Sequence, residues 1–323
     1  MIPLIFSDII KCMRQLAEKN RPELFSPMAR LKSFRFREYF PKGRPMYMNK
    51  KIAIYSAPYP GLESYCDMID FAAEVGVNAL EGFCHFELSS PDIEAAKRIR
   101  EYADKKNVIC PCFSVFADLY HEDPAEKTEW LCRFADVAKI LGSPYLHHTV
   151  IGDCFDHPGV LAKKEELFEL GIKLVRDVTD YAASIGIGTV YEDQGFVFNG
   201  VEGFGRFLGE VDRPVGVVAD TGNVFQTGDT IADFVSAFGS RVKHAHVKDW
   251  AFFPSDPGGY LPTLDGRFAC DVELGKGEID VAGAVALLKS FGYDGYYALE
   301  FSGKSSSDPA YRASLEKLNE ILG

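Results

Sequence analysis

Apolar residues recur along this chain with two alternating periods. Short runs rich in Val, Ile and Tyr, typical of buried strands, fall near residues 52–57, 78–82, 108–115, 144–149, 187–192, 215–219, 242–247 and 295–300. The longer segments between them carry apolar residues at helical spacing, and several end in glycine, which favours the left-handed position after a helix. Eight strand–helix units without a hairpin signal predict a parallel sheet, and their span of about 270 residues matches a (β/α)₈ TIM barrel.

A doubly wound open sheet is the alternative α/β fold. Such a sheet usually begins with a G-x-G-x-x-G turn, and YSAPYPGLESY at residues 55–65 does not match it. We therefore predict one TIM barrel over residues 48–323. Residues 1–47 differ from the rest, with a helix expected over about 8–19 and then a basic, aromatic arm, SFRFREYFPKGRP. They are predicted to form an N-terminal extension. This extension is either an accessory element or a segment upstream of the core, and partial disorder is an alternative to an ordered helix and arm.

Charge and composition restrict the expected partners. The formal net charge is −12, so a phosphate backbone would be repelled and nucleic acid is not expected as a partner. No apolar run reaches 18 residues, so neither a spanning helix nor a membrane partner is expected. The eight cysteines lack the spacing of a disulfide framework, which favours a reduced, cytoplasmic protein.

Polar residues gather at the carboxyl ends of the predicted strands, where TIM barrels place their active sites. These ends carry Glu81, His147 and His148, Glu192, Asp220, His246, and Glu300. The last four residues come from four consecutive strands, and buried carboxylates need a compensating cation. A divalent metal supplies that charge in one step. Three carboxylates and one imidazole favour Mn²⁺ or Mg²⁺, with Co²⁺ or Zn²⁺ as alternatives.

Five sequence strings resemble one known family: YEDQG, VADTGNVF, VKHAHVKDW, LGKGEID and GYDGYYALEF. They are similar to the sugar phosphate isomerase/epimerase family of xylose isomerase-like TIM barrels, which includes ketose 3-epimerases, inosose dehydratases and endonuclease IV. The resemblance covers residues 51–322. It implies that Glu192, Asp220, His246 and Glu300 hold one metal. It also implies that Glu192 and Glu300 move a proton beside a carbonyl, through an enediolate.

Two positions depart from the family pattern. Asn223 stands where many members have histidine, and Phe198 stands where epimerases of free ketoses often carry a second glutamate. These departures weaken a direct ketose 3-epimerase assignment without affecting the predicted metal ligands.

Several further residues are candidates for substrate contact. We expect this role for Lys248, His148, Asn223 and Glu81. A rim ion pair for Lys248, a structural hydrogen bond for His148 and a helix cap for Asn223 are the alternatives.

Four other features accompany this site. His147 should face the helices, and His244 should be a hydrogen-bonded support beneath His246. Asp265 and Arg267 lie in a long segment after the seventh strand, expected to be a solvated loop or a cover over the site. SGKSSS at residues 302–307 is a phosphate-binding or helix-capping candidate.

The favoured function is a metal-dependent isomerase or epimerase of a sugar, keto-sugar or related polyol. A dehydratase of an inosose-type keto-polyol is the close alternative, because the same enediolate can expel a β-hydroxyl. An endonuclease IV-like nuclease and a non-catalytic sugar-binding barrel are remote alternatives. The expected partner is a small sugar or polyol, and a homo-oligomer remains open because the sequence carries no interface signature.

Overall fold

The computed structural model describes residues 50–56, 62–153, 157–258, 260–301 and 308–323. The predicted extension at residues 1–47 and the SGKSSS segment lie outside these ranges. No helix of the described ranges combines the length and the apolar character that crossing a membrane requires.

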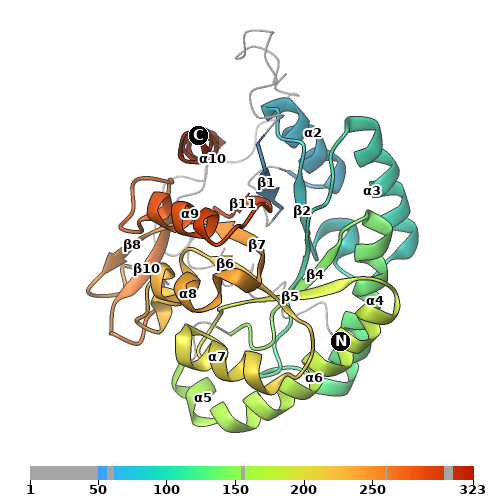
Figure 1. The fold of residues 1–323 in the computed structure, drawn as a ribbon. Helices are drawn as coiled ribbons and strands as arrows, with labels where there is room; N and C mark the ends of the chain where they lie inside the picture. Colours follow the sequence, from blue (N-terminus) through green and yellow to red (C-terminus); the bar gives the residue numbers. More distant parts are fainter. Residues whose placement is uncertain (1–49, 57–61, 154–156, 259, 302–307) are drawn as a thin grey trace, which may run out of the picture. The chain divides into compact units, whose positions relative to one another are not determined.

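Eight parallel strands close into a barrel in the order β1-β11-β7-β6-β5-β4-β3-β2, so the predicted TIM barrel is confirmed. The strands lie inside a ring of helices (Figure 1). Their bounds are β1 Ile52–Tyr55, β2 Leu80–Phe83, β3 Phe113–Val115, β4 Tyr145–His148, β5 Gly188–Glu192, β6 Gly216–Asp220, β7 Val242–Val247 and β11 Tyr297–Leu299.

Strand β3 is shorter than the predicted run of residues 108–115. Pro111 interrupts this run, and proline has no amide hydrogen to donate to a sheet. Only an isolated bridge between Ile109 and Ala79 forms before it. The regular strand therefore begins at Phe113.

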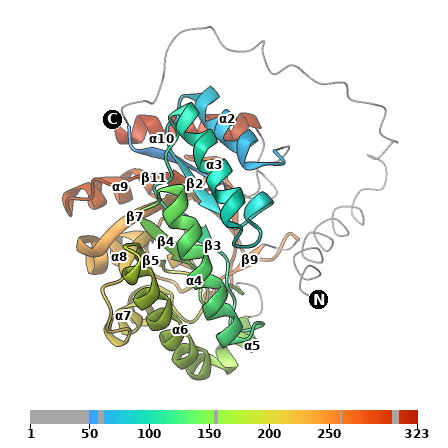
Figure 2. The ribbon, with the colours of Figure 1, turned by 90° about the vertical axis from the view of Figure 1, so that its right-hand side faces the viewer.

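Several helices carry residues at their ends that favour a helix start or stop. Asp92 caps α3, and Asp123 caps α4, which has Pro124 in its first turn. Gly76 and Gly142 follow α2 and α4 with φ values of 77° and 76°, a left-handed conformation that glycine adopts without strain. Figure 2 shows α3, α4 and α6 side by side on the outside of the barrel. The helices are α2 Tyr65–Val75, α3 Ile93–Lys106, α4 Pro124–Leu141, α5 His157–Ala162, α6 Lys164–Ser184, α7 Gly200–Glu210, α8 Ile231–Phe238, α9 Val281–Ser290 and α10 Asp308–Leu322.

The long segment after β7 is an antiparallel sheet and not the simple loop that the sequence suggested. It has the order β8-β10-β9, with bounds β8 Asp249–Phe253, β9 Leu261–Pro262 and β10 Phe268–Val272. Trp250 Nε1 donates a 2.6 Å hydrogen bond to Asp271 Oδ1 across β8 and β10. Asp265 and Arg267 pair with each other, with Nε 2.8 Å from Oδ2, at the margin of this sheet.

Candidate metal centre

The four predicted ligands meet at the carboxyl ends of the barrel strands. Glu192 and Asp220 end β5 and β6, His246 lies in β7, and Glu300 follows β11. Asp220 is the register partner of His246 on the neighbouring strand, which places both side chains at one level. One ligand atom from each of the four residues lies within 4.8 Å of the others, so these groups can hold a metal ion.

Three carboxylates converge on one imidazole nitrogen. Nδ1 of His246 lies 2.9 Å from Glu192 Oε2, 3.3 Å from Glu300 Oε2 and 3.6 Å from Asp220 Oδ2. His246 is buried, while the side chain of Glu300 keeps 19% exposure and is the most accessible of the four. Three negative groups around one nitrogen require a positive charge at that point, either a proton on the ring or a bound cation.

Asp220 has one oxygen that the protein leaves without a hydrogen bond. Its Oδ1 accepts from the backbone N–H groups of Gly222 and Asn223 at 2.8 and 2.9 Å. Its Oδ2 is buried, has no hydrogen-bond partner among the described residues, and forms an ion pair with Lys248 Nζ at 2.9 Å. A buried carboxylate oxygen in this state fits a metal ligand, and the hard oxygen-rich set fits Mn²⁺ or Mg²⁺.

Lys248 places an ammonium among the same carboxylates. Its Nζ lies 3.0 Å from Glu300 Oε1 and 3.2 Å from Asn223 Oδ1. The stem passes over Gly222, where a Cβ atom would approach Lys248 Cγ and Cδ to 2.9 Å, so glycine is needed there. Of the two roles predicted for Lys248, the ion pair is present in this structure. Asn223 faces the same ammonium.

Burial and neighbouring charges shift the pKa values of Glu300 and Asp220 in opposite directions. Burial raises the pKa of Glu300 to about 7, opposed by Lys248 and reinforced by Asp220. Burial also acts to raise the pKa of Asp220, but Lys248 and His246 hold it below its usual value. Burial lowers the pKa of Lys248, yet Asp220 and Glu300 raise it well above its ordinary value, so the ammonium stays charged.

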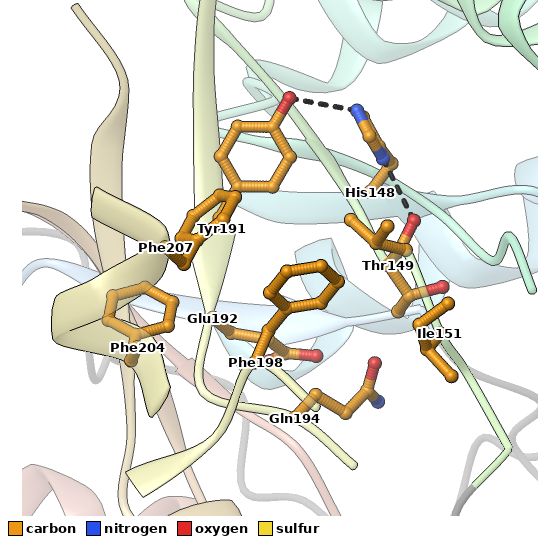
Figure 3. A pocket seen from close by; sticks show the side chains of 10 residues that line it. His148, Thr149, Ile151, Tyr191, Glu192, Gln194, Phe198, Phe204 and Phe207 are labelled. Atoms are coloured by element: carbon orange, nitrogen blue, oxygen red, sulfur yellow. Dashed lines mark hydrogen bonds between the residues drawn. The ribbon is translucent and has the colours of Figure 1, made fainter. Parts of the chain in front are cut away.

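The two histidines of β4 point opposite to the predicted directions. His148 faces the helical layer, where it lines a narrow pocket with Tyr191, Phe204 and Phe207 (Figure 3). Its Nδ1 donates to the Thr149 carbonyl at 2.8 Å, and the Tyr191 hydroxyl donates to its Nε2 at 2.9 Å. Both ring nitrogens are thus engaged within the protein, as in the structural alternative expected for His148, and its contact with substrate stays a prediction.

His147 faces the barrel interior instead. Its Nδ1 lies 2.9 Å from Ser114 Oγ, its register partner on β3, and its Nε2 lies 3.6 Å from Glu192 Oε1. Burial lowers the pKa of His147, although Glu192 acts to raise it. Adjacent side chains of a strand point to opposite faces, so if His148 faces the helices, His147 must face the barrel interior.

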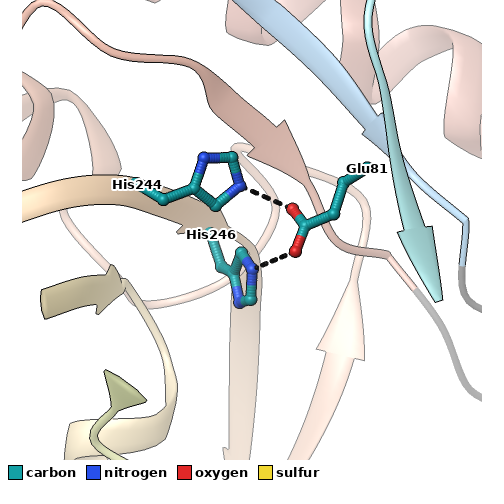
Figure 4. Close-up of side chains that lie close together, drawn as sticks. All are labelled: Glu81, His244 and His246. Carbon is teal, nitrogen blue, oxygen red and sulfur yellow. Dashed lines mark hydrogen bonds and ion pairs between the residues drawn. The ribbon is translucent and has the colours of Figure 1, made fainter. Parts of the chain in front are cut away.

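Glu81 is buried, and its carboxylate contacts both His244 and His246 of β7 (Figure 4). Its Oε2 lies 2.6 Å from His244 Nε2, and its Oε1 lies 3.0 Å from His246 Nε2. Ser114 Oγ donates to the same Oε1 at 2.5 Å. Burial acts to raise the pKa of Glu81, but His246 and His244 hold it well below its usual value, so it is a carboxylate.

This carboxylate orients His246. Because a carboxylate only accepts, Nε2 of His246 must donate to it, and Nδ1 is the nitrogen turned toward Glu192, Asp220 and Glu300. The hydrogen-bonded position predicted for His244 is confirmed. Glu81 has 0% exposure and three partners within the protein, so the structure places it in a supporting position, and its substrate contact stays a prediction.

Sequence reasoning missed two residues beside the ligand cluster, Tyr55 and Ser114, and assigned His147 to the opposite face of its strand. The Tyr55 ring lies edge-on to His246, with ring centroids 5.1 Å apart. Burial, and to a smaller extent the negative charge of Glu300, raises the pKa of the Tyr55 hydroxyl. Tyr55 ends β1, so the strand-end rule could have found it. Ser114 is the polar residue of a three-residue apolar strand, which was the available signal for its inward position.

Comparisons with known proteins agree with the barrel fold. The family model described as Xylose isomerase-like TIM barrel matches residues 69–321. Among curated proteins, no match to the sequence is found.

Similar solved structures include three proteins that share the fold. A D-psicose 3-epimerase with D-tagatose from Clostridium cellulolyticum H10 is 17% identical with a TM-score of 0.64, over 84% of this chain and 99% of that one. The probable 3-DHS dehydratase AsbF, involved in petrobactin synthesis in Bacillus anthracis, is 17% identical with a TM-score of 0.64, over 84% and 98%. A xylose isomerase-like TIM barrel protein from Mycobacterium smegmatis in complex with magnesium is 16% identical with a TM-score of 0.63, over 84% and 96%. At these identities the likeness establishes the fold alone.

Proposed function

Since the chain belongs to the xylose isomerase-like TIM barrel family, we propose that it is a divalent-metal-dependent sugar isomerase or epimerase. The reaction is proton transfer beside the carbonyl of a sugar, keto-sugar or related polyol. The observation that carries the proposal is the convergence of Glu192, Asp220 and Glu300 on Nδ1 of His246. These four residues would hold the ion, with Mn²⁺ or Mg²⁺ favoured by the three carboxylates.

Two glutamates supply the proton transfer. A bound divalent cation acidifies the C–H group beside a carbonyl. Glu192 and Glu300 come from β5 and the segment after β11, so one carboxylate can remove the proton and the other can return it. Glu300 is the more accessible of the two, which suits contact with an entering substrate. Lys248 and Asn223 would bind substrate oxygens beside it.

A dehydratase is the second candidate, and Lys248 favours it. Its buried ammonium, 3.0 Å from Glu300 Oε1, is placed to protonate a departing hydroxyl after Glu300 removes the proton. Proton loss beside the carbonyl and departure of the β-hydroxyl then release one water molecule. The fold is shared by both a psicose epimerase and a probable dehydratase, which supports keeping both reactions under test.

The test is incubation of the Mn²⁺-loaded protein with a panel of ketoses and inososes in D₂O. The proposal predicts deuterium incorporation at the carbon beside the carbonyl, detected by NMR and mass spectrometry. Loss of water from the product identifies the dehydratase. Glu300→Gln keeps an oxygen at the site but removes the base, and it should lose the exchange.

Glu278→Gln is the matched control. Glu278 is an exposed glutamate that accepts a hydrogen bond from the Phe252 amide, away from the four ligands, and its variant should keep wild-type exchange. The proposal fails if the loaded wild type neither exchanges nor dehydrates any compound of the panel. It also fails if Glu300→Gln retains full activity.

A further inference from the structure

The two ring nitrogens of His147 face different surroundings: one meets Ser114 and the other is turned toward Glu192 of the candidate site. It comes from β4 and is 2% exposed. Its Nδ1 meets Ser114 Oγ at 2.9 Å, and its Nε2 is directed toward Glu192 Oε1 at 3.6 Å. The His147 ring thus contacts Ser114, which is bonded to Glu81, on one side and faces Glu192, one of the two proposed proton-transfer groups, on the other.

The positions of the protons determine what His147 offers. Ser114 has one hydroxyl proton, and it donates this proton to the Glu81 carboxylate. The oxygen of Ser114 can therefore only accept from His147, so the proton of the neutral ring is on Nδ1. Nε2 is then a lone pair facing the site.

That lone pair has no partner among the described residues. Nε2 is buried without a hydrogen bond, and the group across from it, Glu192 Oε1, is also an acceptor. Two buried acceptors that face each other need a donor between them. His147 is not among the four residues whose ligand atoms cluster within 4.8 Å, so it is not grouped with them as a fifth metal ligand.

We propose that His147 Nε2 accepts a hydrogen bond from a substrate hydroxyl that lies beside Glu192. This inference rests on the proposed function and specifies its substrate class. The substrate is a polyhydroxylated ketone with a free hydroxyl near the carbon from which Glu192 takes or to which it returns the proton. His147 is then a substrate-binding residue that holds this carbon against the Glu192 carboxylate.

A pair of variants separates this role from a structural one. In His147→Asn the amide nitrogen replaces Nδ1 and keeps donating to Ser114, but no atom replaces Nε2. In His147→Gln the amide oxygen can reach the position of Nε2. His148→Asn is the control, because its ring faces Tyr191 and the helical layer.

Steady-state kinetics in D₂O with the best ketose of the panel provide the first readout. His147→Asn should raise KM about three- to tenfold, the effect of losing one hydrogen bond, with Mn²⁺ stoichiometry unchanged. His147→Gln should recover part of this loss. The monodeoxy analogue that lacks the hydroxyl bound by His147 should have the same KM with wild type and with His147→Asn, because neither protein can form this hydrogen bond with it. An unchanged KM in His147→Asn, or an equal KM penalty for every deoxy analogue, overturns the inference.

The second readout does not depend on turnover. Nitrogen-15 NMR of histidine-labelled, Mg²⁺-loaded protein should show His147 as the Nδ1–H tautomer, with an Nε2 signal that shifts on saturation with D-fructose. An Nε2–H tautomer, an imidazolium, or an unshifted Nε2 signal overturns the inference. Absence of exchange or dehydration with every compound refutes the proposed function instead, so the two failures are distinguishable.

Discussion

Glu81 Oε1 lies 3.0 Å from His246 Nε2, and both residues are buried although 165 positions separate them in the sequence. The same oxygen accepts a hydrogen bond from the Ser114 hydroxyl, and the Ser114 oxygen accepts one from Nδ1 of His147. One carboxylate thereby orients two imidazoles: Nδ1 of His246 toward the carboxylate cluster and Nε2 of His147 toward Glu192. The geometry of the candidate site thus depends on a fully buried carboxylate.

Replacement of Glu81 by glutamine tests this dependence. An amide has one acceptor oxygen for the three donors that now meet the carboxylate, so buried donors lose their partner. We expect the free energy of unfolding to fall by about 3 kcal/mol. Mn²⁺ affinity should fall about 10- to 100-fold, because His246 is no longer held in one orientation.

Urea denaturation and Mn²⁺ titration measure the two effects of Glu81→Gln. Glu94→Gln, a change at an exposed glutamate on α3, is the control and should leave both quantities within about 0.5 kcal/mol of wild type. Wild-type metal affinity in Glu81→Gln would show that the orientation of His246 does not depend on Glu81.

Lys248 should compete with the metal. Its ammonium lies 2.9 Å from Asp220 Oδ2 and 3.0 Å from Glu300 Oε1, so it satisfies two carboxylates that an ion also needs. Lys248→Met removes the charge and keeps an apolar stem. Mn²⁺ affinity should rise on the order of tenfold, while the metal-free protein becomes less stable because Asp220 and Glu300 lose a counter-charge.

Isothermal titration with Mn²⁺ compares Lys248→Met with wild type. Lys243→Met is the matched control, since Lys243 is an exposed residue of the same strand. An affinity that drops in Lys248→Met, with Lys243→Met unchanged, would mean that the lysine supports the ion and does not compete with it.

His148 makes stability depend on acid. Burial lowers its pKa from 6.5 to about 3, opposed by the Thr149 carbonyl, which accepts from Nδ1. Between these values the unfolded chain binds a proton that the folded chain does not, so the stabilisation is complete above pH 6.5 and decreases as the pH falls. From pH 6.5 to 5 this contribution to the unfolding free energy decreases by on the order of 2 kcal/mol.

Urea denaturation at pH 7, 6 and 5 checks the prediction. His148→Asn should lose less stability over this range than wild type. Tyr191→Phe removes the donor to Nε2, so it should be about 1 kcal/mol less stable but keep the wild-type dependence on acid. Parallel pH curves for wild type and His148→Asn would rule out His148 as the origin of the acid dependence.

The barrel and its four acidic or imidazole strand ends could be predicted because each depends on a local pattern. The apolar period places the strands, and parallel strands bring their carboxyl ends to one rim, where Glu192, Asp220, His246 and Glu300 meet. The antiparallel sheet after β7 could not be predicted in this way. Its strands are held by pairing across a long connection, such as the contact of Trp250 with Asp271.

The directions of the two β4 histidines were equally beyond local reasoning. Adjacent residues of a strand point to opposite faces, so an assignment shifted by one position exchanges their roles. The register with β3, which pairs His147 with Ser114, decides the matter. Likewise, nothing near Glu81 in the sequence shows that two histidines of β7 will enclose its carboxylate.

The central claim is that Glu192, Asp220, His246 and Glu300 hold one divalent ion, and its most direct test is elemental analysis after loading with Mn²⁺ and gel filtration. We predict one Mn²⁺ per wild-type chain. Asp220→Asn, which keeps Oδ1 for the Gly222 and Asn223 amides but replaces the oxygen that faces His246 and Lys248 by an amide nitrogen, should bind far less. His121→Gln, a change in the separate group of Asp118, His121 and Asp153, whose ligand atoms also lie within 4.8 Å of one another, should keep full occupancy. A wild type without stoichiometric Mn²⁺, or an Asp220→Asn protein that binds like wild type, would contradict the account.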